Sequence, residues 1–499
     1  MGKGARSNKK HAEAFRAQQK EAAARDVGLR RTRIIAVIAA AVVICAIAAL
    51  FIRAFVRDTR NSNGYYMRNA VAVSNDKVSV DAAQMSYFFF NRVNNTLANY
   101  YSLYSSYYYT QYSTFSSFLK DMTGLDLSAS LKTQYRGSVT WFDYFMDLAE
   151  KDVSSYIALY SKAVDSGLYL TEDDLANIKT RTAEVDLSDY GTGINAGDVE
   201  NALKLKTLAD IYKYTVADGT EITDAELGSY FDEHYTDYTY IDYMVYSFEY
   251  GTDGTVGTKD EAKSWADRAA ASSDREGFEA IISEAVGKAN AADAIDEAVI
   301  TKKAFVASEA ITKLFEKEMK ENDTFITENT TDEDKGAYFV YMLLKSPYMD
   351  EEKTVDVRHI LISSYEDDDE KKAEAERIYA LFEASDGSEE AFAALARRYS
   401  EDESSLVRGG LYRRVQEGGT TSAAFDEWCF GTERAPGDSG VTQTSYGYHV
   451  MYFVGYDIGK SLASAYDDLI DEKISDVIAA LEEEYPVSFD SEAYKTINT

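Results

Sequence analysis

The sequence predicts an α+β protein with a single N-terminal transmembrane helix, a mainly helical region, two similar α+β modules in tandem and a C-terminal helix. Three observations lead to this prediction: an uncharged apolar run near the N-terminus, long stretches with helical spacing of apolar residues, and two later segments with a shared outline. The length of 499 residues suits about three folded units. With 45% hydrophobic residues and three prolines, the chain is globular over most of its length.

Charge is unevenly distributed along the chain. Overall, 52 Lys and Arg oppose 85 Asp and Glu, a net charge of −33, yet residues 1–33 hold 10 basic and 3 acidic residues. The remainder therefore carries 42 basic against 82 acidic residues. Nucleic-acid affinity depends largely on basic groups that neutralise phosphates, so such an acidic body excludes nucleic acid as an expected partner.

An apolar run explains the charge asymmetry. Residues 34–52 are 19 residues without a charge, which as a helix match the hydrocarbon core of a bilayer. We predict a basic cytoplasmic tail at 1–33, a transmembrane signal anchor at 34–56 and an extracytoplasmic body, because the basic excess lies before the run. This makes the protein a single-pass protein of the cell membrane. A cleaved signal peptide is the alternative, since residues 46–49 could be read as a cleavage site, whereas a lipid anchor on Cys45 is disfavoured by Ile44 before it.

Residues 57–237 are predicted to be mainly helical after a short strand and turn at 70–82. Thr171-Glu-Asp-Asp174 and Thr223-Asp-Ala-Glu226 are typical capping boxes that open helices. An aromatic stripe recurs there at three- and four-residue spacing: Leu97, Tyr101, Tyr104, Tyr108, Tyr112 and Phe115. Two interpretations of the stripe stay open, namely a face packed against neighbouring helices or a groove for apolar segments of another polypeptide.

Residues 238–347 and 354–457 share an outline: a β-rich opening, charged helices and an aromatic-rich closing strand. We interpret them as two related α+β modules in tandem, with 238–347 as a plain insert being the alternative. The final segment, 458–499, has helical apolar periodicity up to Pro486 and is expected to form a C-terminal helix that returns to the helical region.

The most specific pattern lies in residues 354–457. It consists, in order, of Val357-Arg-His-Ile-Leu-Ile362, Ala391-Phe-Ala-Ala-Leu-Ala396, Tyr399-Ser-Glu-Asp402, Gly409-Gly-Leu411, Phe425, Pro436-Gly437 and Thr444-Ser-Tyr-Gly-Tyr-His-Val450. This segment resembles the parvulin-type peptidyl-prolyl isomerases. The wider plan of anchor, helical segment, parvulin module and returning helix resembles the membrane-attached PrsA foldases and the periplasmic SurA chaperones, which implies a chaperone role for 57–237.

The resemblance implies a site between two histidine-bearing strands. It assigns catalytic positions to His359, Asp402, Thr444 and His449, and the walls of a proline pocket to Leu411, Thr421, Phe425 and Trp428. There are departures from the family. Thr421 stands where methionine is usual, Trp428 replaces a small residue, and Gly409-Gly-Leu-Tyr412 lacks one residue of the usual Gly-Gly-x-Leu-Gly. The first module is expected to be degenerate, because Tyr243 falls where the second has His359 and Phe339 where it has His449.

The residue chemistry suits such an activity. Rotation about an X–Pro bond faces a barrier of about 18–20 kcal/mol because the amide loses its resonance. Lowering this barrier needs a dry pocket for the prolyl ring and polar groups that favour the twisted amide. It needs no nucleophile, so we expect no metal and no cofactor. The only two cysteines, Cys45 and Cys429, offer neither a plausible internal disulfide nor a cysteine metal site.

Together these features predict a membrane-anchored foldase that isomerises X–Pro bonds in unfolded or newly exported polypeptides. Phosphorylated Ser/Thr-Pro is not an expected substrate, because residues 363–369 are acidic where phosphate-directed parvulins carry arginines. The alternative function is that of a holdase, in which the helical region binds clients and the parvulin modules are catalytically weak or inactive.

Overall fold

The computed structural model describes residues 64–112, 114–251, 257–304, 308–316, 318–332, 335–365, 367–420 and 422–499. The predicted tail at 1–33 and anchor at 34–56 lie outside these residues, as does Thr421. Among the described residues, no helix is both long and apolar enough to cross a membrane. The chain forms two compact units, Met1–Lys213 with Val477–Thr499, and Tyr214–Asp476.

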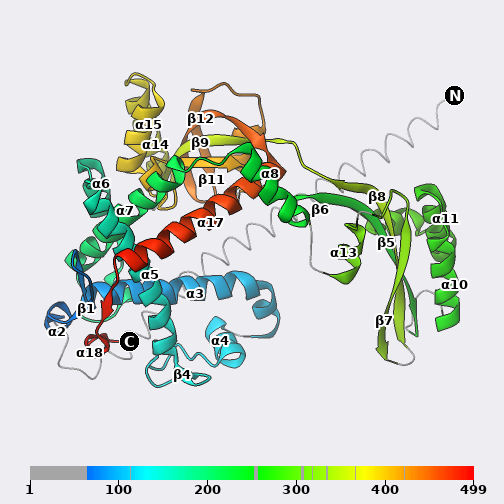
Figure 1. Cartoon of the computed structure of the whole chain (residues 1–499), viewed down its shortest axis with the longest axis horizontal. Helices are drawn as coiled ribbons and strands as arrows, with labels where there is room; N and C mark the ends of the chain where they lie inside the picture. Colours follow the sequence, from blue (N-terminus) through cyan, green and yellow to red (C-terminus); the bar gives the residue numbers. More distant parts are fainter. Residues whose placement is uncertain are drawn as a thin grey trace. The chain divides into compact units, whose positions relative to one another are not determined.

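The first unit is built mainly from helices (Figure 1). These are α2 (Tyr65–Arg68), α3 (Ala82–Gln111), α4 (Phe115–Thr123), α5 (Trp141–Asp165), α6 (Glu172–Glu184), the 3-10 helix η1 (Leu187–Tyr190), most of α7 (Ala196–Gly219), the end of α17 (Lys460–Glu484) and α18 (Ser491–Tyr494). Strands β1 (Val71–Ser74), β2 (Ser79–Asp81) and β13 (Ser488–Phe489) form a sheet in the order β13-β1-β2, and β3 (Tyr135–Arg136) pairs with β4 (Val139–Thr140).

Local sequence sets the helix starts. Thr171 and Thr223 open α6 and α8 (Asp224–Glu233) with complete capping boxes, which confirms both predicted starts. The hydroxyl of Thr140 accepts a hydrogen bond from the backbone N–H of Asp143 and so caps α5. Each cap satisfies amides that the first helical turn leaves without a partner.

The aromatic stripe is mostly core. Leu97, Tyr101 and Phe115 are buried in the large apolar cluster of the first unit, around the fully buried Trp141. Helix α3 ends at Gln111 and α4 begins after the Thr114 cap, so the stripe does not run along one helix. Tyr104 is 39% exposed, and the side chain of Tyr108 lies outside the described residues. The packing interpretation therefore holds for the three buried members.

The C-terminal segment completes the core of the first unit. Strand β13 pairs with β1 through Val73 and Phe489, and Ile497 is 1% exposed within the apolar cluster. The Lys132 ammonium donates to the carbonyl oxygens of Tyr494 and Ile497 at 3.3 and 2.7 Å. The two ends of the body are thus joined in one core.

The second unit contains two four-stranded antiparallel sheets. Its other elements are α8, α9 (Tyr235–Tyr238) and the start of α17. The first module comprises β5 (Tyr240–Tyr250), α10 (Lys259–Ala270), α11 (Arg275–Val286), α12 (Ala291–Ala298), β6 (Val299–Ala304), α13 (Glu309–Leu314), β7 (Thr324–Asp332) and β8 (Lys335–Tyr348). The second comprises β9 (Lys353–Ile362), α14 (Asp368–Glu383), α15 (Glu389–Tyr399), the 3-10 helix η2 (Leu406–Arg408), β10 (Leu411–Val415), α16 (Ala423–Phe430), β11 (Ser439–Thr444) and β12 (Gly447–Gly459).

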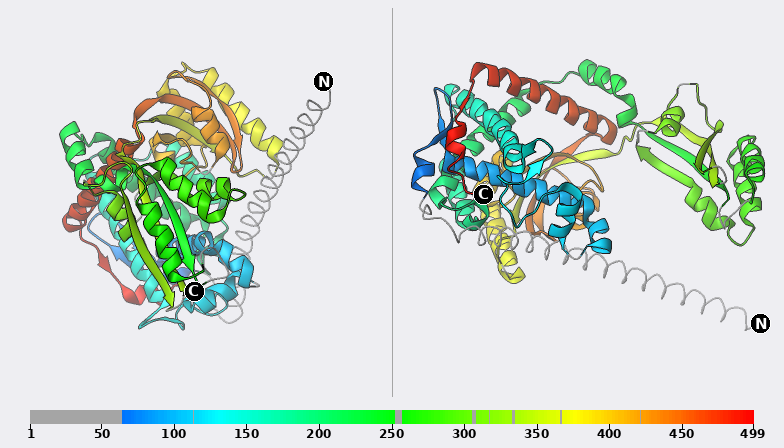
Figure 2. Two further views of the ribbon diagram at one scale, coloured as in Figure 1. Left: turned by 90° about the vertical axis from the view of Figure 1, so that its right-hand side faces the viewer. Right: turned by 90° about the horizontal axis from the view of Figure 1, so that it is seen from below.

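The two modules have the same topology. Their strand orders are β6-β5-β8-β7 and β10-β9-β12-β11. In each module the second strand along the chain is at one edge, followed by the first, the fourth and the third. One sheet face carries two helices, α10 with α11 in the first module and α14 with α15, yellow in Figure 2, in the second. The opposite face is covered by α13 in the first module and by α16 in the second.

A shared bulge fixes which residues of the modules correspond. Lys302 and Arg414 both adopt positive φ, 47° and 50°. Their backbone N–H groups donate to the carboxylates of Asp242 and Asp356, each at 2.8 Å. Three residues after each aspartate stand Val245 in the first module and His359 in the second.

The strand register agrees with this correspondence. In the first module Val245 pairs with Tyr341, and Ser247 pairs with Phe339. In the second module the corresponding pairs are His359 with Met451, and Leu361 with His449. Phe339 therefore stands at the position of His449, as the sequence predicted. The predicted match of Tyr243 with His359 is two residues out of register. Tyr243 and Val245 are two residues apart on one strand, so they face the same side of the sheet and both fit the pattern. The bulge decides which of them corresponds to His359, and the sequence does not reveal the bulge.

We expect Ile497→Ala to destabilise the first unit by about 2–5 kcal/mol, the usual cost of emptying a buried aliphatic site. Amide hydrogen exchange in α3 and β1 of the full chain measures this loss. Lys495→Ala, an exposed change two residues earlier, is the matched control and should stay within about 0.5 kcal/mol. Equal protection in both variants would contradict the role assigned to the C-terminal segment.

Candidate active site

Two paired strands bring the predicted histidines together. His359 lies on β9 opposite Met451, and His449 lies on β12 opposite Leu361, so the two side chains are diagonal neighbours on one face of the sheet. Their Nδ1 atoms are 3.0 Å apart and their rings stack with centroids at 5.3 Å. Both side chains are buried, at 2% and 5% exposure.

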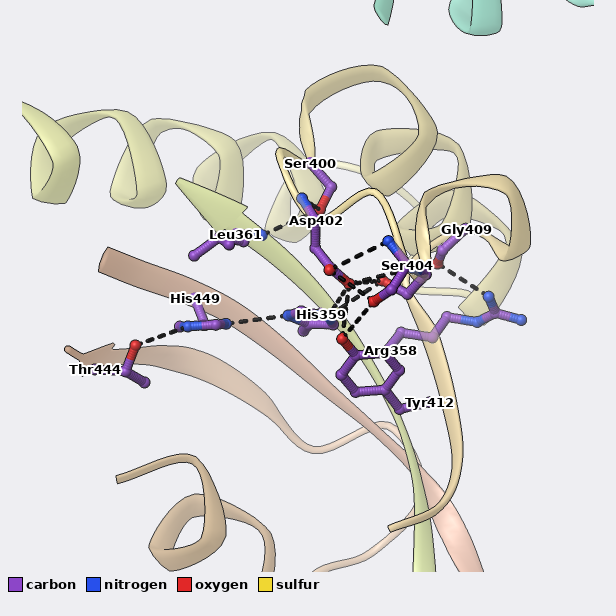
Figure 3. A network of polar contacts seen from close by, with 11 residues as sticks. Arg358, His359, Leu361, Ser400, Asp402, Ser404, Gly409, Tyr412, Thr444 and His449 are labelled. Carbon is purple, nitrogen blue, oxygen red and sulfur yellow. Dashed lines mark hydrogen bonds and ion pairs between the residues drawn. The ribbon is translucent and has the colours of Figure 1, made fainter. Parts of the chain in front are cut away.

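A continuous chain of hydrogen bonds runs through this pair (Figure 3). Thr444 Oγ1 lies 2.9 Å from His449 Nε2, and Asp402 Oδ2 lies 2.9 Å from His359 Nε2. His359 Nε2 donates to the carboxylate of Asp402, and the directions of the bonds between the two Nδ1 atoms and between His449 and Thr444 depend on the tautomers of the rings. All four predicted catalytic residues thus lie in one network.

Asp402 is surrounded by further donors that the sequence analysis missed. Ser405 Oγ donates to Asp402 Oδ2 in a short hydrogen bond, Tyr412 OH donates to the same oxygen at 3.0 Å, and Ser404 Oγ donates to Oδ1 at 2.7 Å. Backbone N–H groups of Ser404 and Ser405 add two weaker bonds. The sequence held a signal for the two serines, because they stand only two and three residues after Asp402.

These contacts set the charges of the site. Burial alone would raise the pKa of Asp402, but hydrogen bonding and charge from His359, with the hydroxyls of Ser405 and Ser404, hold that pKa below its usual range. Burial, together with the charge of His359, lowers the pKa of His449 to about 3 against the opposing effect of Asp402. His449 is therefore neutral near pH 7, next to an ionised Asp402.

The loop between α15 and β10 is tied to β9. Glu401 accepts four hydrogen bonds from the backbone and hydroxyl groups of Ser363 and Ser364, at 2.6 to 2.7 Å. Gly410 adopts φ 74°, and a Cβ there would lie 2.2 Å from the carbonyl oxygen of His359. Only glycine permits this approach, so the two-glycine motif places the loop directly against the histidine strand.

A pocket of about 270 Å³ opens on the network. It is lined by His359, Leu361, Asp402, Tyr412, Thr420, Ser422, Phe425, Tyr446 and His449. Phe425, on α16, presents its ring edgewise to both histidines at 5.6 Å. The pocket is smaller than a typical site for a drug-sized ligand, about 300–1,000 Å³, and suits a single small ring. Within the described part of the chain, no group of three or more His, Cys, Asp or Glu is placed to hold a metal ion.

Of the three predicted pocket residues that the structure describes, only Phe425 lines this pocket. Trp428 packs beneath it in the α16 cluster, with the Arg434 guanidinium 3.9 Å from its ring centroid. Thr421 lies outside the described residues. Leu411 is buried but is not part of the lining.

The position of Leu411 has a simple cause. Leu411 pairs with Arg358, whose guanidinium bonds Glu389 on the α15 side, whereas Tyr412 pairs with Val357 on the pocket face. Successive side chains of a strand point to opposite faces of the sheet, so Leu411 and Tyr412 lie on different faces. Tyr412 therefore lines the pocket where leucine was expected.

We expect the free energy of unfolding of this module to fall as the pH is lowered from about 6.5. An unfolded histidine titrates near ~6.5, while burial lowers the pKa of His449 to about 3. Between these values the unfolded chain binds the extra proton, so acidification favours unfolding, by up to about 1.4 kcal/mol per pH unit. Asp402 changes the free energy of unfolding in the same direction. The stability that its ionised form contributes is lost as the pH falls below the pKa of an unfolded aspartate, ~3.9.

Hydrogen exchange of β12 amides at pH 7 and pH 5, corrected for intrinsic rates, measures this slope. His449→Gln removes the titrating ring and should give a shallower dependence. Identical slopes for the two proteins would show that His449 does not control this dependence.

Comparison with known proteins assigns the module to a family. Residues 341–454 match the model of the PPIC-type PPIASE domain. No curated protein matches the chain.

Solved structures give low overall similarity. PrsA from Bacillus subtilis has 12% identity over 72% of this chain and 94% of its own, with a TM-score of 0.25. The peptidylprolyl isomerase PrsA from Bacillus anthracis has 19% identity over 27% of this chain, with a TM-score of 0.19, and the matched region spans 61% of that protein. A SurA-like chaperone structure from Campylobacter jejuni has 20% identity over 26% of this chain and 52% of its own, with a TM-score of 0.17. The matched residues take in the end of β8 and most of the second module, and the match agrees with the independent geometry of the site, so the second module is a parvulin domain of the PPIC-type peptidyl-prolyl isomerase family.

Proposed function

We propose that this chain is a membrane-anchored, extracytoplasmic peptidyl-prolyl cis-trans isomerase and chaperone that acts on exported polypeptides with X–Pro bonds. The observation that carries the proposal is the small pocket in which Phe425 faces a buried, hydrogen-bonded histidine pair and an ionised Asp402.

The geometry suggests how rotation is accelerated. Phe425 offers an apolar wall for the prolyl ring, which orients the X–Pro bond over the histidines. A planar amide carries more negative charge on its oxygen than a twisted amide, because resonance is lost on twisting. The fixed negative charge of Asp402 and a neutral His449 therefore disfavour the planar amide relative to the twisted one.

The membrane location is supported by sequence. The uncharged residues 34–52 follow a strongly basic leader, and the short segment 53–63 that follows the run holds only three basic residues, Arg53, Arg57 and Arg60. An acidic body outside the membrane and a basic tail inside agree with one span. Clients are expected to be unfolded chains, and no nucleic-acid partner is expected.

We further propose that residues 238–347 are a degenerate parvulin-like module with a structural or peptide-binding role. Its sheet has the strand order and bulge of the second module, but Val245 and Phe339 stand at the two histidine positions. Its α13 face is filled by an apolar cluster that includes Tyr243, Leu314 and Phe325. This module favours the second candidate function, a holdase, for that part of the chain.

Phe425→Ala should lower kcat/KM for X–Pro tetrapeptides at least ten-fold, because it removes the wall that holds the prolyl ring. A protease-coupled assay of cis-to-trans conversion measures it. Leu381→Ala, 41% exposed on α14, is the control and should leave the rate unchanged.

His449→Ala should also lower turnover, but unfolding must be checked beside it, because loss of one partner of a buried hydrogen bond costs about 1–3 kcal/mol. If folded Phe425→Ala isomerises as fast as the unchanged chain, the proline-pocket assignment fails and the holdase function is favoured.

The exported protein should remain membrane-bound with its basic tail intact, because the uncharged run stays as an anchor. Membrane fractionation with N-terminal sequencing, and protease added outside intact cells, test this. A mature N-terminus near residues 48–55, or a body that external protease does not reach, would contradict the topology.

A further inference from the structure

We propose that Tyr65 and Tyr66, the exposed tyrosines of α2, dock on the outer headgroup layer of the membrane and hold the first unit close to that surface. The inference rests on the proposed transmembrane anchor at 34–56 and adds a lipid-facing surface to it. The occupant of this surface is the bilayer in which the anchor lies.

Helix α2 is held on the body by its inner side. Met67 is 3% exposed within the apolar cluster of the first unit. The Arg68 guanidinium binds both carboxylate oxygens of Asp198, at 2.9 and 2.7 Å, and donates to the carbonyl oxygen of Gly193 at 2.8 Å. Gly64 adopts φ 62°, and a Cβ there would lie 1.9 Å from the same carbonyl oxygen, so only glycine permits this approach. The first described residue is therefore fixed on the body.

The two tyrosines lie on the outer side of α2, which Figure 1 shows at one edge of the first unit. Tyr65 is 61% exposed and Tyr66 is 63% exposed, and their rings meet edge to face with centroids 5.7 Å apart. A tyrosine ring has an apolar body and a polar hydroxyl, which suits the boundary between lipid headgroups and acyl chains. The inner side of α2 thus binds the protein, and its outer side presents a pair of amphipathic rings.

The length of chain before α2 limits how far the two tyrosines can be from the bilayer. Eleven residues, 53–63, separate the uncharged run from Gly64. Such a segment spans at most about 36–40 Å when fully extended and averages about 17–20 Å as a flexible coil. Among the described residues, no other exposed aromatic side chain is as close in sequence to the anchor. The tyrosines therefore lie within reach of the membrane interface.

Local charge favours the same occupant. Residues 53–70 hold four arginines and one acidic residue, Asp58, whereas the chain beyond residue 33 carries 42 basic against 82 acidic residues. The phosphates of a headgroup layer attract a basic stretch and repel an acidic surface, so the membrane is expected to approach this end of the body. The bilayer is also the one surface that the anchor keeps beside α2 at all times, which favours it over a client or a second copy of the chain.

The test uses the full chain reconstituted in vesicles of phosphatidylcholine and phosphatidylglycerol, with and without bromine on the acyl chains. Tyr66→Trp keeps the interfacial preference of an aromatic ring and adds a fluorophore that brominated lipid quenches on contact. We expect brominated lipid to lower the added fluorescence by about half or more. Tyr135→Trp, at a tyrosine of β3 that is 66% exposed, is the matched control and should lose no more than about a tenth.

Removal of both rings should loosen the segment between the anchor and the body. In the double variant Tyr65→Ser with Tyr66→Ser, we expect trypsin to cut the vesicle-bound chain after Arg57 and Arg60 at least about five-fold faster, because the segment leaves the surface more often. Tyr135→Ser should leave the rate unchanged. Mass spectrometry of the released body measures the cleavage.

Extraction with alkaline carbonate distinguishes the failure of this inference from the failure of the proposed topology. Release of the chain from the vesicles overturns the anchor, whereas a retained chain with an unquenched Tyr66→Trp overturns the docking alone. Quenching is measured before extraction, so it decides the docking in either case. Protection from trypsin without quenching overturns the lipid assignment. It assigns the tyrosines to a second copy if the protection rises with protein density, and to a client if it appears only when unfolded polypeptide is added.

Discussion

The site depends on the antiparallel pairing of β9 with β12. This register sets His359 opposite Met451 and His449 opposite Leu361, so that the two rings meet diagonally on one face. A slip of one residue by either strand would turn its histidine to the α14–α15 face, into the cluster of Ile360 and Val450. Apolar residues on both faces make such a slip costly, and the bulge at Asp356 and Arg414 fixes the register of the neighbouring pair β9–β10. The positions of the two histidines are therefore set by the apolar clusters on the two faces of the sheet rather than by contacts of the histidines themselves.

The dependence of the site on strand pairing explains why only part of the architecture and of the site could be predicted from the sequence. Paired histidine strands, capping boxes and the Asp402 loop are local patterns, and the structure places His359, His449, Asp402 and Thr444 in one network. Tyr412 rather than Leu411 lies on the pocket face because it pairs with Val357, and the match between the modules depends on a bulge with positive φ at Lys302 and Arg414. Such features depend on the partner strand, so the residue pattern of one strand does not reveal them.

Comparison of the two modules distinguishes the residues that the fold requires from those that the chemistry of the pocket requires. Both keep the aspartate that accepts a bulge N–H, the paired helices on one face and a single covering helix on the other. They differ at the pocket: Val245, Phe339 and Ile300 replace two histidines and a tyrosine without loss of the strand order. The sheet therefore does not need its polar residues for stability. Their presence in the second module is a cost, because buried polar groups must each find a partner.

This cost accounts for the residues around Asp402. A carboxylate in a mostly enclosed pocket requires hydrogen-bond donors for both of its oxygens. Here His359, Ser405 and Tyr412 serve one oxygen and Ser404 the other. The choice of aspartate thus imposes the neighbouring hydroxyls. Tyr412 reaches Asp402 because it pairs with Val357 on the pocket face of the sheet.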